Sequence, residues 1–116
     1  MLKYSVEQMN NIRIIIMEGQ VAVNERNTLK KILENEKDVK EVFYILNLSQ
    51  VFYIDSFGIS FLQNLILGND NRRKLIIVSE KEYINYVIRF NKLDKLMNVK
   101  FVGSISDAVR LFESMG

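Results

Sequence analysis

The residues with the clearest chemical potential in this chain are Asp55 and Ser56, which stand between an apolar run and a helical pattern. The run Val42–Ile54 is rich in aliphatic and aromatic residues, and the residues after Ser56 repeat apolar side chains three and four positions apart. Ser56 is therefore predicted at the first turn of a helix, where backbone N–H groups lack helical partners and the helix dipole favours negative charge. A serine hydroxyl in that place is well suited to carry a phosphate.

The same position also allows a purely structural role. Serine and aspartate are both common N-cap residues, so either Ser56 or Asp55 could cap the helix, and we expect Asp55 to have this role. Gly58 is predicted where the helix start packs closely against the sheet or approaches a partner closely.

Two absences restrict the chemistry, because the chain contains no histidine and no cysteine. Ser-His-Asp and Cys-His catalysis, the usual zinc sites and a disulfide framework are therefore excluded. Ile54 also stands where the nucleophile elbow of a serine hydrolase requires glycine. We expect no enzymatic activity, no metal and no cofactor.

The composition suits one ordinary globular domain, predicted over residues 1–116. Sixteen basic and fourteen acidic residues give a net charge of +2, which is no reason to expect direct binding to nucleic acid or to a membrane surface. The amino-terminal residues lack the apolar region of a signal peptide, and no stretch approaches the roughly 18 apolar residues of a spanning helix. A cytoplasmic location is expected.

Hydrophobic periodicity predicts alternating strands and helices that position Ser56. The predicted strands are Tyr4–Met9, Ile12–Met17 ending at Gly19, Val42–Leu48 followed by Val51–Ile54, Leu75–Val78 and Val99–Val102. The predicted helices are one over about Glu25–Asn35 that Asn24 can cap, one from Ser56 or Phe57 to about Leu67, one starting with a capping box at Ser79–Glu82, and one capped at Ser104–Asp107. A tight turn is expected at Asn10-Asn11. The aromatic residues Phe43, Tyr44, Phe52 and Tyr53 are expected in the core rather than on a nucleic-acid surface.

The order β-β-α-β-α-β-α-β-α implies parallel strand pairing with right-handed crossovers, plus one antiparallel hairpin at the start. The predicted fold class is α/β, with a mixed central sheet of about five strands and about four packed helices.

Three segments resemble motifs of STAS domains, specifically those of the small bacterial anti-sigma factor antagonists. Leu46–Ser49 resembles the family's strand ending in Asp/Asn-Leu-Ser, and Ile54–Ile59 resembles its Ile-Asp-Ser-Ser/Ala-Gly-Leu motif. Asn91–Leu96 resembles its Thr-Gly-Leu-Asp-Lys-Leu segment, and Gly19 matches the glycine after the second strand. The resemblance extends over almost the whole chain and includes the element order, so it implies a STAS-like fold.

In that family the serine directly after this aspartate is the phosphorylation switch. The resemblance implies that the unphosphorylated chain binds an anti-sigma factor of the serine-kinase type and frees a sigma factor for transcription. The kinase would end this binding by phosphorylating Ser56, and a PPM-type serine phosphatase would restore it. The partner-binding residues that the resemblance implies are Asp55, Ser56, Phe57, Gly58, Gln20, Val21 and Ala22.

The chain departs from the family pattern at three places, and the departures at Ala22 and Phe57 support a second function. Gly-Gln-Val-Ala at 19–22 replaces the family's Gly-Glu-Leu-Asp, and Phe57 replaces a small residue. Lys92 replaces a helix-ending glycine, with Asn91 able to adopt a left-handed conformation instead. The alternative is a non-switching scaffold or accessory STAS domain of a stress-signalling or lipid-transport complex. Phe57 itself is expected either to anchor a partner from a partly exposed position or to pack inward under a loop.

Overall fold

The computed structural model describes residues 1–40, 43–67, 73–91 and 100–115. These residues form strands and helices in the predicted order. The strands are β1 (Lys3–Met9), β2 (Ile12–Val21), β3 (Phe43–Ile54), β4 (Lys74–Val78) and β5 (Lys100–Val102). The helices are the short 3-10 helix η1 (Val23–Glu25) and the α-helices α1 (Arg26–Glu36), α2 (Ser56–Leu67), α3 (Glu82–Phe90) and α4 (Ile105–Met115).

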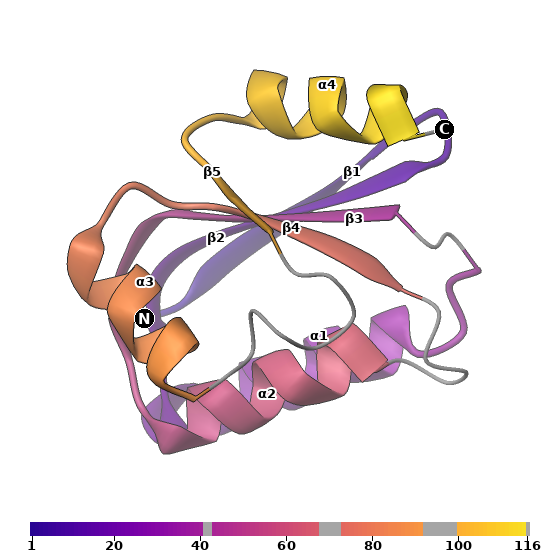
Figure 1. The fold of residues 1–116 in the computed structure, drawn as a ribbon. Helices are drawn as coiled ribbons and strands as arrows, with labels where there is room; N and C mark the ends of the chain where they lie inside the picture. The colour runs from indigo at the N-terminus through magenta and orange to yellow at the C-terminus, as the bar shows by residue number, and fades with distance from the viewer. Residues whose placement is uncertain (41–42, 68–72, 92–99, 116) are drawn as a thin grey trace.

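The five strands form one mixed sheet in the order β1-β2-β3-β4-β5. β1 pairs antiparallel with β2, and every other neighbouring pair is parallel. Figure 1 shows α4 over one face of the sheet and α1 and α2 over the other face. The fold class predicted from the sequence, a mixed α/β sheet with four packed helices, is thereby confirmed.

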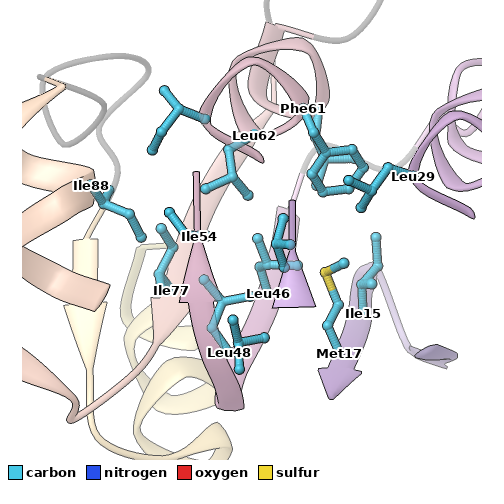
Figure 2. Packing of buried hydrophobic residues seen from close by; sticks show 14 of the residues in the cluster. Ile15, Met17, Leu29, Leu46, Leu48, Ile54, Phe61, Leu62, Ile77 and Ile88 are labelled. Carbon is cyan, nitrogen blue, oxygen red and sulfur yellow. The ribbon is translucent and has the colours of Figure 1, made fainter. Parts of the chain in front are cut away.

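The sheet has an apolar cluster on each face, because its central strands are buried on both sides. Ile15 and Leu46 point to the cluster beneath α1, α2 and α3, whereas Ile14 and Ile45 point to the smaller cluster beneath α4. In Figure 2, helical side chains converge on the first of these clusters, among them Leu29, Phe61, Leu62 and Ile88. β2 is therefore buried on both faces.

Two strands are longer than the sequence predicts. β2 continues through Gly19 to Val21, and its pairing with β3 shifts register on either side of this glycine. Gly19 has φ 119°, and a Cβ there would lie 2.5 Å from the carbonyl oxygen of Met1. β3 runs unbroken from Phe43 to Ile54, so Ser49 and Gln50 lie within the strand rather than between two strands.

The tight turn predicted at Asn10 is confirmed by its positive φ of 53°. The predicted cap at Ser104 is also confirmed, because its Oγ accepts a hydrogen bond of 3.1 Å from the backbone N–H of Asp107.

Three other predicted helix ends are wrong, because the side chains concerned take other partners or conformations. Asn24 lies within η1 and donates its amide to Gln20 Oε1 rather than capping α1. Ser79 Oγ accepts from the N–H of Lys81, and α3 starts only at Glu82, so the capping box does not form. Asn91 has φ −87° and is not left-handed. The resembling segment from Lys92 to Leu96 lies outside the described residues, as do Val42 and Val99.

A buried charged cluster lies at the end of the sheet opposite to Ser56. Glu36, 1% exposed, accepts hydrogen bonds from Arg13 Nε (2.9 Å) and Nη2 (2.8 Å) and from the Tyr44 hydroxyl (3.0 Å). Arg73 is also buried; it donates to the carbonyl oxygens of Leu65 (2.9 Å) and Glu36, and its guanidinium lies 4.6 Å from the centre of the Tyr44 ring. Burial raises the pKa of Tyr44 well above its ordinary value, although the Arg73 charge acts in the opposite direction.

Candidate functional site

Asp55 links the start of α2 to the loop after β2. Its Oδ1 accepts a hydrogen bond of 3.0 Å from the N–H of Gly58, the third residue of the helix, and this is the N-cap contact expected from the sequence. Its Oδ2 accepts a second bond of 3.0 Å from the N–H of Val23. Its own backbone N–H donates to the Val21 carbonyl at 3.4 Å. One carboxylate therefore fixes the helix start to the loop beside it.

Ser56 is the first residue of α2 and is exposed. Among the described residues, its hydroxyl makes no hydrogen bond to the protein. Since Asp55 supplies the cap, the Ser56 hydroxyl is available to solvent or to another protein. It lies where the amino end of the helix dipole favours an added negative charge.

Gly58 allows α2 to approach β2 closely. It is buried, and a Cβ at this position would overlap the carbonyl oxygen of Val21. The sequence-based expectation of close packing at Gly58 is confirmed, because the carbonyl occupies the space that any side chain would need.

The segment Gln20–Ala22, formed by the end of β2 and the residue after it, lies beside this helix start, but most of it faces inward. Val21 is 0% and Ala22 2% exposed, and the half-buried Gln20 binds Asn24 through its side-chain oxygen. The side chains directly after this segment, Val23 (48% exposed) and Asn24, are exposed. The Val21 carbonyl therefore positions Asp55 and closely approaches Gly58, and contact of this segment with a partner stays a prediction.

Phe57 lies between the two alternatives offered by the sequence. It is half-buried and packs against the main core. It lines a groove of about 250 Å³ between α1 and α2. The other residues of the groove are Leu29, Lys30, Leu33, Ser60, Phe61 and Asn64. The groove begins one residue from Ser56 and is mainly apolar.

The amino end of α3 supports the segment that leads into the site. β4 pairs with β3 only as far as Asn47, so within the described part of the chain the later carbonyl groups of β3 have no strand partner on that side. Lys81 Nζ donates to the carbonyl oxygens of Ser49 (2.6 Å) and Val51 (3.1 Å), and the Tyr83 hydroxyl donates to Ile54 O at 3.3 Å. These two side chains take the place of a neighbouring strand directly before Asp55.

Exposed aromatic side chains lie on this segment and on α3, and the sequence pattern did not lead us to expect them. Phe52 and Tyr53 are 60% and 43% exposed, so their predicted core position is wrong, whereas Tyr44 is buried and Phe43 partly buried. Phe52 and Tyr53 are exposed because this half of β3 extends beyond its pairing with β4. The exposed aromatics of α3 are Tyr83, Tyr86 and Phe90. Their spacing of three and four residues, on the face opposite to Ile84 and Ile88, was a signal that could have revealed them.

The described residues contain no group of three or more His, Cys, Asp or Glu side chains that could hold a metal ion. None of the described helices is both long and apolar enough to cross a membrane.

Comparison with known proteins identifies the fold. A family model of the STAS domain matches residues 3–108. A search of curated protein sequences gave no match.

Several solved structures are similar along nearly the whole chain. An anti-sigma factor antagonist from Mycobacterium paratuberculosis has a TM-score of 0.84 at 15% identity, with 97% of this chain and 95% of that chain covered. A putative anti-sigma factor antagonist from Thermotoga maritima has a TM-score of 0.81 at 21% identity, with coverage of 95% and 94%. The murine Slc26a9 anion transporter has a TM-score of 0.71 at 18% identity, with 95% of this chain but 19% of that chain covered. At these identities the likeness shows a shared fold.

Proposed function

The chain belongs to the STAS domain family, and we propose that it is an anti-sigma factor antagonist whose partner binding is controlled by phosphorylation of Ser56. Unphosphorylated, it binds a serine-kinase-type anti-sigma factor in the cytoplasm and frees a sigma factor for transcription. The kinase modifies Ser56, and a PPM-type phosphatase removes the phosphate. The chain supplies a substrate and a surface, and its partners supply the catalysis.

The observation that carries this proposal is the separation of tasks at the start of α2. Asp55 caps the helix with Oδ1, so Ser56 is not needed as a cap and its hydroxyl is exposed. A kinase can reach this hydroxyl without unfolding the helix. The likeness to structures named as anti-sigma factor antagonists supports the same assignment.

The charge of a phosphate explains how modification ends binding. Phosphorylation adds about −1.5 to −2 charges at Ser56. The first turn of α2 tolerates an anion while it is solvated. In a complex, the phosphate must lose water next to the Asp55 carboxylate, so the free energy of binding becomes less favourable.

Phosphosite mapping tests the assignment. The chain is incubated with ATP and the anti-sigma factor that co-purifies with it from its own cell, and phosphopeptides are then sequenced. We expect one phosphate, on Ser56. Ser60, exposed one turn later on α2, serves as an internal control. Labelling confined to Ser60, Ser49 or Thr28 would exclude Ser56 as the switch.

Two variants separate the charge from the fold. Ser56→Asp is expected to fold normally, because the amino end of a helix favours a carboxylate. It is expected to bind the anti-sigma factor more weakly, because the added carboxylate must lose water next to Asp55 in the complex. Ser56→Ala is expected to stay bound in the presence of ATP, with a small change in unfolding free energy because Asp55 provides the cap. Equal affinity of Ser56→Asp and the unmodified chain in calorimetric titration would contradict a charge-based switch.

A second function, a scaffold or accessory STAS domain without a kinase cycle, is favoured by two observations. Ala22 is buried where the family pattern has an aspartate, and a similar fold forms a minor part of an anion transporter. Neighbouring genes for a serine kinase and phosphatase would favour the switch, and neighbouring transporter genes would favour the accessory domain.

A further inference from the structure

Strand β1 forms an open edge of the sheet. β2 pairs with one side of it, and within the described residues no strand pairs with its other side. The backbone N–H and C=O groups on the open side of such a strand can pair with another extended chain.

The side chains of β1 are arranged symmetrically about Ser5. Lys3 and Glu7 stand two residues to either side of it, share one face of the strand and are exposed. Tyr4 and Val6 stand one residue to either side, share the opposite face and pack, partly buried, against the main core. Within the described part of the chain, neither Lys3 nor Glu7 is in an ion pair.

We propose that β1 is a self-association edge, on which a second copy of this chain pairs antiparallel about a two-fold axis through Ser5. In this register Lys3 lies opposite the partner's Glu7, and Glu7 lies opposite the partner's Lys3. Tyr4 lies opposite the partner's Val6 on the other face. Opposite charges and aromatic–β-branched pairs are both favourable when directly opposed across antiparallel strands.

The charges select this register over its neighbours. A shift that places Tyr4 opposite the partner's Tyr4 leaves Lys3 opposite a serine. A shift that places Val6 opposite the partner's Val6 leaves Glu7 opposite a serine. Larger shifts place Lys3 opposite lysine or Glu7 opposite glutamate, which is unfavourable. A lysine on an edge strand usually discourages pairing, but here the same strand carries the matching acid at the symmetric position.

The edge is separate from the site at Ser56. β2 lies between β1 and β3, and β3 is the strand that leads into Asp55 and Ser56. Pairing through β1 therefore leaves the α2 start of both copies exposed, and the inference does not depend on the proposed switch. One strand pair is a small interface, so we expect a weak dimer with a dissociation constant in the micromolar range or above.

Sedimentation equilibrium on the full chain tests the edge, over concentrations from about 1 μM to about 1 mM. Lys3→Glu and Glu7→Lys each place like charges opposite one another at both ends of the strand pair, so each variant should dimerise at least tenfold more weakly. The double variant Lys3→Glu/Glu7→Lys restores both opposite pairs and should dimerise like the unmodified chain. Glu34→Lys makes the same charge change on the exposed face of α1 and should leave the dimer unchanged.

Mixing the two single variants gives the sharpest result. Lys3→Glu has two acidic side chains on its edge and Glu7→Lys has two basic ones, so a heterodimer should form from two proteins that are each monomeric. Circular dichroism confirms that all variants are folded. An unmodified chain that stays monomeric over the whole range would overturn the proposal. So would single variants that dimerise normally, or a mixture that forms no heterodimer.

Discussion

Two neighbouring side chains at the start of α2 have different tasks. Asp55 uses both carboxylate oxygens, one for the N–H of Gly58 and one for the N–H of Val23. Ser56, next to it, is exposed, and its hydroxyl makes no hydrogen bond to a described residue. This arrangement allows Ser56 to change chemically while Asp55 keeps the helix in place.

Replacement of Asp55 tests this separation. Asp55→Ala removes the cap and the tie to Val23, and is expected to lower the unfolding free energy by about 1–2 kcal/mol in urea denaturation. Asp55→Asn keeps one acceptor oxygen and should lose less. Asp38→Ala, at an exposed aspartate outside the helices, is the control. A loss for Asp55→Ala no larger than for Asp38→Ala would contradict the capping role.

Phe57 is expected to affect both stability and binding, because it is half-buried in the groove that begins beside Ser56. Phe57→Ala should cost clearly less stability than Phe61→Ala, since Phe61 is 2% exposed and a fully buried aromatic costs about 3–5 kcal/mol. If the groove meets the anti-sigma factor, Phe57→Ala also weakens that complex by about 2 kcal/mol. Equal stability losses for the two variants with unchanged affinity would make Phe57 a core residue only.

The structural roles of Asp55 and Gly58 could be predicted from the sequence, whereas the exposure of the side chains around them could not. Asp55 and Gly58 were predictable, because an acid directly before a helix is a common cap and a glycine in its first turn permits close packing. The burial of Val21 and Ala22 was not predictable from the sequence, because it follows from the extension of β2 past Gly19. The exposure of Phe52 follows from where β4 stops pairing, which is a property of the sheet rather than of the local sequence.

At the scale of elements, a single side chain joins two helices to the sheet. Arg73, just before β4, donates to carbonyl oxygens at the carboxyl ends of α1 and α2, through Glu36 and Leu65. A cation at this end also interacts favourably with both helix dipoles. Strand and helix types followed from periodicity, but no local pattern indicated this contact, because an arginine in a short basic run is expected only to flank a loop.

Arg73→Lys is expected to destabilise the protein by about 2–4 kcal/mol, because an ammonium cannot reproduce the planar fork that serves both helices. Arg89→Lys is the matched control. Arg89 also lies 4.6 Å from an aromatic ring, that of Phe101, but is exposed. Thermal and urea unfolding compare the two. Similar small losses would show that the contact with the aromatic ring, and not the helix ends, accounts for Arg73.

At the scale of the whole molecule, the buried charged cluster and the exposed Ser56 hydroxyl lie at opposite ends of the sheet. Glu36, Arg73 and Tyr44 each contact the other two and are buried, whereas Ser56 is exposed. Modification at one end can therefore proceed without exposing charges buried at the other.

Because of Tyr44, the unfolding free energy is expected to fall as the pH rises in the alkaline range. The pKa of Tyr44 is raised in the folded state, so its contribution is complete below about pH 10 and is lost as the pH rises above that value, where the unfolded chain ionises first. Tyr44→Phe should reduce the fall in unfolding free energy above about pH 10, by up to about 1.4 kcal/mol per pH unit. Urea titrations between about pH 8 and 11 measure this slope. Tyr86→Phe, at an exposed ring, is the control, and identical slopes for both variants would contradict it.

The order of the strands across the sheet is also their order along the chain. No strand has to enter between two that already pair, so a nascent chain can extend the sheet in one direction as it leaves the ribosome. The contacts needed at each step lie within or next to the segment just synthesised, which keeps the loops that must close short. The start of α2 can therefore assemble on β2 and β3 before β4, β5 and α4 have been translated. The edge of β1 is present from the first hairpin onward, while each later strand covers the edge of the one before it.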